Sequence, residues 1–206
     1  MDTWAKCDAE REALCGDLGG LSPAQWDTQS LCTEWKVRHV VAHLVAGGDV
    51  NALGSFVGLV RNGMNFNRYI RREALAEGTA PPETLLAGLR KTVGGRRTPP
   101  MAKPVIVLTD TVCHSADIRR PLGIARQLPE ETLVEVADCL KGIGFPLGTT
   151  KRISGLRLTA TDAPWSTGDG PSVEGPAESL ILAMAGRPAG LAECTGEGVA
   201  TLKSRM

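Results

Sequence analysis

The sequence predicts a mainly helical protein, with a helical bundle over residues 1–150 followed by a small α+β region over residues 151–206. Two observations lead to this prediction. Apolar residues recur at helical spacing in most segments before residue 150, whereas residues 153–161 alternate with period two and carry β-branched side chains. The length of 206 residues suits one large domain with a small appendage, and an apolar content of 42% is enough for a substantial core.

Glycine and proline signals divide the first half of the chain into helices. Residues 3–18 are predicted to be a helix that Gly19 and Gly20 end, and a capping-box spacing over 22–25 predicts a short helical turn. Residues 34–62 are predicted to form one long helix, which Gly47 and Gly48 allow to kink or to pack closely. Its apolar stripe consists of Val37, Val40, Val41, Leu44 and Val45, continued by Leu53, Val57 and Val60.

Further helices follow at similar spacing. They are predicted over about 65–77, 82–93, 104–120 and 129–144, with loops at 78–82, 94–100 and 121–123. After residue 150 the pattern changes to a strand over 153–161, a turn-rich stretch over 162–170 and a second short strand over 172–174. A helix over 176–185 and a mostly helical segment up to 203 complete the prediction.

Charge and cysteine usage exclude several classes of protein. Lysine plus arginine equals aspartate plus glutamate at 23 each, so no basic excess points to nucleic acid or to an acidic membrane surface. The six cysteines form no Cys-x-x-Cys pair, and the N-terminus shows no signal-peptide pattern. No apolar run approaches the length of a membrane span. We therefore expect a cytoplasmic protein with free thiols, most of them small core residues.

A candidate metal site stands out in the predicted helix over 104–120. Asp110 and His114 are four residues apart, so they share one helical face in an otherwise apolar segment. Burying a carboxylate and an imidazole is costly unless a partner compensates, and a borderline cation such as zinc binds both groups. His43, inside another apolar helix, is a third candidate ligand, because facing helices of a four-helix bundle can converge on a core metal. Asp117 could orient one imidazole from outside the ligand set.

The residues alone leave alternatives open. Asp110 and His114 could form a buried hydrogen bond without a metal, with His43 satisfied elsewhere. His39 is one helical turn before His43 and could be a surface histidine beside Lys36 and Arg38, or could replace Asp110 in a two-imidazole face. Cys113 lies about 100° around the helix from His114, so we assign it to the core.

Several motifs resemble one known family. Residues 32–44 (CTEWKVRHVVAHL) resemble the first motif of the mycothiol-dependent maleylpyruvate isomerase family, and residues 110–123 (DTVCHSADIRRPLG) resemble its second motif. Residues 155–170 and 175–188 are similar to its C-terminal region, so the resemblance covers nearly the whole chain. It implies a DinB-like four-helix bundle, of the type found in actinobacterial proteins, with a small C-terminal α+β tail.

The resemblance also implies a divalent metal and a thiol cosubstrate. Family members bind the metal through a first-motif histidine and a Glu-x-x-x-His pair, which correspond to His43, Asp110 and His114 here. Aspartate replaces the family's glutamate, so its carboxylate reaches about 1.5 Å less far, against metal–oxygen bonds of about 2.0–2.2 Å. We expect the metal to be zinc and the thiol to be mycothiol.

The expected function is therefore metal-dependent transfer or isomerisation by way of a thiol, acting on a small electrophilic substrate. Arg119 or Arg120 could hold a substrate carboxylate bidentately, although both also suit the C-terminal end of a helix. Trp165 could line a ligand pocket or could serve ordinary packing. The alternatives are a metal-free or non-thiol enzyme of secondary metabolism, with Asp110 and His114 as an acid–base pair, or a non-catalytic binding protein. The sequence is also compatible with a homodimer.

Overall fold

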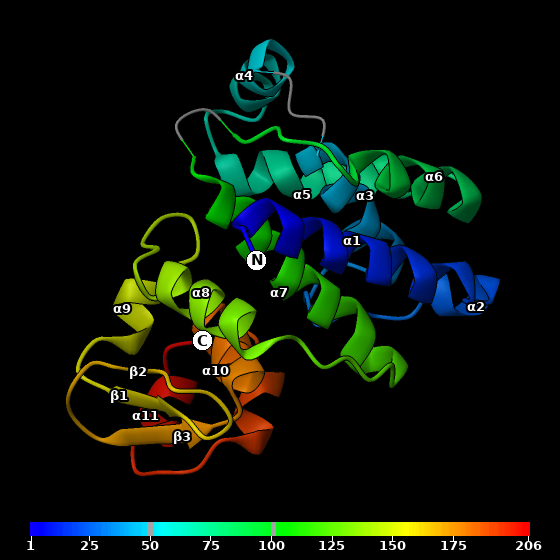
Figure 1. Cartoon of the computed structure of the whole chain (residues 1–206). Coiled ribbons are helices and arrows are strands. Elements are labelled where there is room, and N and C mark those ends of the chain that lie inside the picture. The colour runs from blue at the N-terminus through cyan, green and yellow to red at the C-terminus, as the bar shows by residue number, and fades with distance from the viewer. Residues whose placement is uncertain (49–51, 100–101) are drawn as a thin grey trace. The chain divides into compact units, whose positions relative to one another are not determined.

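The computed structural model describes residues 1–48, 52–99 and 102–206, and it confirms the predicted fold class (Figure 1). The described chain is mostly helical, with a three-stranded sheet near its C-terminus. It divides into two compact units, Met1–Ala125 and Arg126–Met206. Residues 126–150, which the sequence pattern groups with the bundle, belong to the C-terminal unit, because the helix over Glu130–Lys141 packs against the one over Ala177–Met184.

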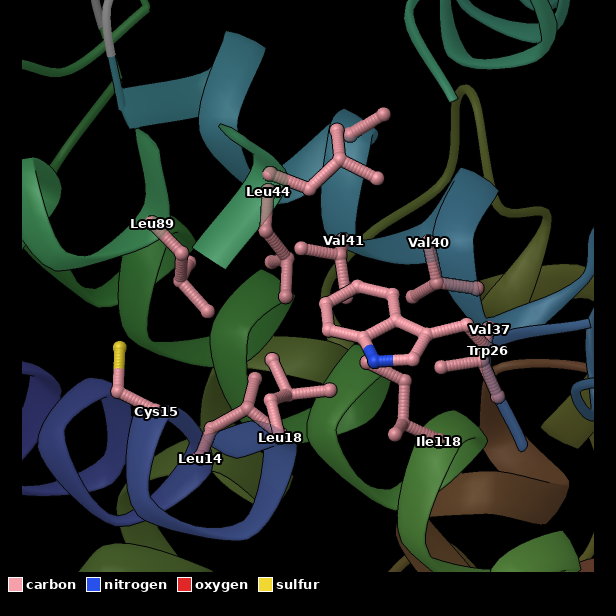
Figure 2. Close-up of a cluster of buried hydrophobic side chains, with 12 residues drawn as sticks. Leu14, Cys15, Leu18, Trp26, Val37, Val40, Val41, Leu44, Leu89 and Ile118 are labelled. Carbon is pink, nitrogen blue, oxygen red and sulfur yellow. The ribbon is translucent and has the colours of Figure 1, made fainter. Parts of the chain in front are cut away.

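The N-terminal unit is a helical bundle. Its elements are α1 (Thr3–Gly19), α2 (Pro23–Trp26), α3 (Val37–Gly48), α4 (Ala52–Arg61), α5 (Phe66–Glu77), α6 (Pro82–Thr92) and α7 (Pro104–Leu122). Both α1 and α3 pack against α6 and against α7, so these four helices enclose one core. Figure 2 shows that core, to which α1, α3, α6 and α7 contribute and to which α2 adds Trp26. Its labelled residues are Leu14, Cys15, Leu18, Trp26, Val37, Val40, Val41, Leu44, Leu89 and Ile118.

Local capping sets the ends of these helices. The carboxylate of Asp2 accepts a hydrogen bond from the Ala5 amide at 2.9 Å and so begins α1. Helix α7 ends at Gly123, whose φ of 67° is left-handed, and the amide of Ile124 donates to the Arg119 carbonyl at 3.0 Å. This is the Schellman arrangement, in which glycine avoids the cost that a β-carbon would add at positive φ.

The predicted long helix over 34–62 corresponds to α3 and α4, while residues 49–51 lie outside the described part of the chain. Its first half agrees with the prediction, since the stripe on α3 is buried in the core. Its second half differs. Val57 and Val60 on α4 are exposed, and the side chain of Leu53 is not among those described. Helix α4 packs against α5, where Gly58 allows the Tyr69 ring to approach closely, and so this apolar stripe does not extend the α3 core.

The C-terminal unit combines a small sheet with short helices. Its elements are α8 (Glu130–Lys141), α9 (Thr149–Ile153), β1 (Arg157–Ala160), β2 (Ser166–Thr167), β3 (Ser172–Gly175), α10 (Ala177–Met184), the 3₁₀ helix η1 (Pro188–Glu193) and α11 (Val199–Lys203). The strand order is β2-β1-β3, with β1 antiparallel to β2 and parallel to β3. Leu158 pairs with Val173 and both are fully buried, which fixes the sheet face that contacts the unit's core.

Two parts of this unit differ from the sequence prediction. The strand predicted over 153–161 is shorter, because α9 extends to Ile153, and the turn-rich stretch contains β2.

Among the described residues, no helix is both long enough and apolar enough to cross a bilayer.

Candidate metal centre

The packing of α3 on α7 brings three predicted ligands together. His43 lies on α3, while Asp110 and His114 share one face of α7. Nε2 of His43 is 3.4 Å from Oδ1 of Asp110, and Nε2 of His114 is 3.5 Å from the same oxygen. The two imidazole rings meet edge-on, with centroids 4.7 Å apart. One ligand atom from each residue lies within 4.8 Å of the other two.

The spacing of these atoms suits a cation better than direct hydrogen bonds. Zinc bonds of about 2.0–2.1 Å in a tetrahedron place neighbouring ligand atoms about 3.3–3.4 Å apart. The observed 3.4 and 3.5 Å are close to that edge. Hydrogen bonds between a nitrogen donor and a carboxylate are usually shorter, about 2.7–2.9 Å. The residues therefore fit a divalent metal, with Asp110 at the place in the sequence that the resemblance assigns to a glutamate.

The centre is accessible on one side. The Asp110 side chain is 40% exposed, whereas His43 and His114 are 15% and 11% exposed. The carboxylate is thus the ligand that solvent reaches most, so a further ligand has access from its side. Three protein ligands and one open position are typical of catalytic rather than structural zinc sites.

The opposite edge of His114 is held by two further side chains. Oδ2 of Asp117, which is completely buried, lies 2.9 Å from Nδ1 of His114 and 3.1 Å from Sγ of Cys32. A carboxylate at Nδ1 favours the tautomer with its proton there, which leaves the Nε2 lone pair facing Asp110. The predicted orienting role of Asp117 thus has a geometric basis.

Cys32 and Trp35 are further residues of the site, and neither was predicted from the sequence. The Trp35 ring lies 5.1 Å from the His43 ring and 5.9 Å from the His114 ring, so it covers both imidazoles. Both residues precede α3 in the segment 32–44, whose likeness to the family's first motif was the available signal. Because both residues lie far from α7 in the sequence, their contacts with Asp117 and His114 could not be predicted from a local pattern.

His39 caps the start of α3 and does not lie among the three candidate ligands. Its Nδ1 accepts a hydrogen bond from the Lys36 amide at 3.1 Å, so it caps the first turn of α3 as the glutamate of a capping box would. Burial lowers the pKa of His39, and the nearby Arg38 and Lys36 charges lower it further. The two-imidazole alternative of His39 with His43 therefore finds no support, since Asp110 and His114 face His43 instead.

The two arginines at the end of α7 differ in their surroundings. Arg119 is buried, its Nε donates to Asp17 Oδ2 at 2.6 Å, and its Nη1 contacts Glu10. These contacts tie α7 to α1 and leave its guanidinium no access to a substrate carboxylate. Arg120 is half-buried, and its predicted role in substrate binding stays a prediction.

Trp165 is buried in the C-terminal unit. Its indole N–H donates to Oδ1 of Asp138 at 3.0 Å, and Lys141 donates to the same oxygen at 2.6 Å. The hydrogen bond from Lys141 lowers the pKa of Asp138, and that from Trp165 adds to the effect. These contacts account for Trp165 as a packing residue of its own unit, while a ligand role stays a prediction.

The fold and the site together define a helical-bundle protein whose facing helices present two histidines and a carboxylate to one point. Residues 7–103 match the family model of the mycothiol maleylpyruvate isomerase N-terminal domain. This match agrees with the resemblance seen in the motifs.

Solved structures show the same fold over almost the whole length. One is the crystal structure of the mycothiol-dependent maleylpyruvate isomerase, whose sequence is 15% identical to this chain and whose fold matches with a TM-score of 0.66. Another is the crystal structure of a histidine-to-alanine mutant of the mycothiol-dependent maleylpyruvate isomerase, with 16% sequence identity and a TM-score of 0.65. Each comparison covers 95% of this chain and 91% of the other. No curated protein gave a significant match.

Proposed function

We propose that this protein is an enzyme that holds a divalent cation, zinc being the best fit, between His43, Asp110 and His114, and that it uses a low-molecular-weight thiol. Mycothiol is the thiol named for the similar isomerase and is our choice here. The substrate is a small electrophile, and the reaction is S-transfer or thiol-dependent isomerisation.

The observation that carries the proposal is the placement of three ligand atoms by α3 and α7. Asp110 Oδ1 lies about one tetrahedral edge from Nε2 of each imidazole, all three ligand atoms lie within 4.8 Å of one another, and Asp110 is the most exposed of the three side chains. Asp110 and His114 share a helix face by local geometry alone, whereas the approach of His43 from a second helix supports a ligand shared by all three.

Each residue of this chain has a role in that arrangement. Asp117 holds the Nδ1 proton of His114, so that the Nε2 lone pair stays directed at the centre. Asp110 supplies a negative charge that offsets the charge of the cation. Trp35 covers the two rings and excludes water from that side, which strengthens electrostatic interactions within the site.

The chemistry follows from the ligand set. When bound, the cation supplies a positive charge that lowers the pKa of a coordinated thiol, so that sulfur is nucleophilic near neutral pH. The sulfur attacks an electrophilic carbon of the substrate. In S-transfer a leaving group departs with its bonding electrons as the carbon–sulfur bond forms, and that bond remains in the product. In isomerisation the thiolate adds to an activated carbon–carbon double bond, the former double bond rotates as a single bond, and the carbon–sulfur bond then breaks, which reforms the double bond and returns the thiolate. We propose Arg120 as the partner of a substrate carboxylate.

Metal analysis tests the proposal first. The purified protein should contain about one divalent metal per chain or should be stabilised by added zinc, and a His43→Ala variant should lose this response. Mass spectrometry after incubation with mycothiol and maleylpyruvate or a simple electrophile then tests the thiol chemistry. Products that form equally fast without protein would exclude thiol transfer. Bound metal with turnover that is independent of thiol would favour the non-thiol enzyme instead.

A further inference from the structure

We propose that Cys32 is a positioning residue of the centre, which acts on His114 through Asp117. This inference rests on the proposed metal function. Cys32 is not itself a ligand in this scheme. The Cys32 thiol holds the Asp117 carboxylate, which in turn holds the His114 imidazole. Cys32 therefore determines how well Nε2 of His114 is directed at the cation.

The distances separate this role from a second metal site. Oδ2 of Asp117 lies 3.1 Å from Cys32 Sγ and 2.9 Å from His114 Nδ1, while Sγ and Nδ1 are 3.9 Å apart. The two short contacts have the lengths of hydrogen bonds to a carboxylate, in contrast to the 3.4 and 3.5 Å spacing on the other edge of His114. The thiol S–H therefore donates to Asp117. It stabilises a fully buried carboxylate without bringing in a competing positive charge.

The loop that carries Cys32 is built to stay in place. Nε2 of Gln29 donates to the carbonyls of Cys32 and Trp35 at 2.7 and 2.9 Å. The Ser30 hydroxyl donates to the Trp35 carbonyl at 2.6 Å and accepts the Cys32 amide at 3.1 Å. These side-chain contacts add to backbone hydrogen bonds from the Ser30 amide to the Trp35 carbonyl and from the Trp35 amide to the Cys32 carbonyl, each 3.0 Å long, so Cys32 reaches α7 from a defined position.

Pro121 gives this loop its attachment point on α7. In a continuous helix the amide of residue 121 would donate to the carbonyl of Asp117, four residues earlier. Proline has no amide hydrogen, so that carbonyl is available to another donor. The Leu31 amide donates to it at 3.1 Å. The backbone of Asp117 thus holds Leu31 while its side chain holds Cys32, and the loop and the His114 face of α7 form one unit.

Three variants of the full chain test the inference: Cys32→Ala, Cys32→Ser and, as a control, Cys139→Ala, which removes a cysteine of similar burial in the other unit. The metal alone is the probe, with cobalt(II) affinity and its visible absorption as readouts. Loss of the thiol donor should weaken cobalt binding about tenfold, the lower end of the range for residues that orient a ligand. Serine should restore most of the affinity, because its hydroxyl can donate to Asp117.

A second readout needs no metal. Nitrogen NMR of the histidine rings reports the tautomer of His114 in the metal-free protein. The Nδ1–H form should dominate in wild type and in Cys32→Ser, and its population should fall in Cys32→Ala. Unchanged tautomers together with unchanged cobalt affinity in Cys32→Ala would overturn the inference. If wild type binds no cobalt, the proposed function fails, and the tautomer shift alone decides whether Cys32 positions His114.

Discussion

The imidazoles of His43 and His114 face one another edge-on, with an interplanar angle of 74°, although they belong to helices far apart in the chain. Asp110 Oδ1 lies about equally far from Nε2 of each ring. The relationship depends on how α3 packs against α7, since neither helix alone contains the full ligand set.

Removal of one imidazole should abolish metal binding. We expect His43→Ala to weaken zinc affinity by more than about 100-fold, beyond the range for residues that only orient a ligand. His39→Ala is the matched control, one turn away on the same helix. It should keep the metal and lose about 0.5–1 kcal/mol of stability through the missing cap. Isothermal titration and thermal unfolding measure the two effects, and equal loss of metal in both variants would contradict the assignment.

The carboxylate at position 110 should matter for its charge more than for its length. Asp110→Asn should weaken zinc binding about tenfold or more, because a neutral amide oxygen is a poorer ligand for a divalent cation. Asp110→Glu introduces the glutamate that the family's motif has at this position. Its zinc affinity should stay within about tenfold of wild type, because the exposed side of Asp110 can accommodate one more methylene group. A competition assay with a zinc indicator compares them. Loss of binding in the glutamate variant alone would show that the site is built for the shorter side chain.

Arg119 should behave as a structural residue. Its buried guanidinium faces Glu10 and Asp17, so Arg119→Ala removes a buried cation from beside a buried carboxylate and a partly buried one. Such breaks cost about 3–5 kcal/mol. Denaturant unfolding should show this loss. If the variant remains folded, its KM for substrate should stay near the wild-type value, and a selective rise in KM without destabilisation would return Arg119 to the substrate site.

His39 should make stability depend on pH. Its pKa is lowered in the folded protein from the ordinary value of 6.5, so below that value the unfolded chain binds more protons than the folded one. The free energy of unfolding therefore falls as pH drops below about 6.5, and it stops falling once the pH is below the pKa of His39 in the folded protein. Above about pH 6.5 the contribution of neutral His39 to stability is fully present. A His39→Gln variant should show a shallower decline between pH 7 and pH 5 by urea unfolding. Identical slopes in the two proteins would contradict the direction of this shift.

Pro121→Ala should compete with the loop attachment. The new amide can donate to the Asp117 carbonyl and continue the helical hydrogen bonding, so the Leu31 amide loses its acceptor. We expect faster hydrogen exchange at Leu31 and weaker cobalt binding, while the helix itself is not destabilised. Leu122→Ala, also in the last turn of α7, serves as the control, because it leaves the Asp117 carbonyl unchanged. Unaltered exchange at Leu31 would show that the loop is held in other ways.

Much of this molecule follows from local patterns in the sequence. Helical periodicity and capping signals predicted most of the helices, because amphipathic spacing and the cost of unsatisfied amides act over a few residues. The pairing of Asp110 with His114 on one face is likewise a local consequence of helix geometry. The exposure of Val57 and Val60 on α4 was not predictable in this way, since the apolar pattern of a helix does not say which neighbour it packs against.

The tertiary structure alone decided which distant side chains meet. The meeting of His43 with His114, the hydrogen bond from Cys32 to Asp117 and the burial of Arg119 between two carboxylates all depend on the packing of α1 and α3 and the docking of the loop against α7. The family resemblance named the three ligands but not the residues behind them. Local sequence determines which residues share a helix face, whereas packing between helices determines what that face contacts, and the chemistry of this site depends on the second.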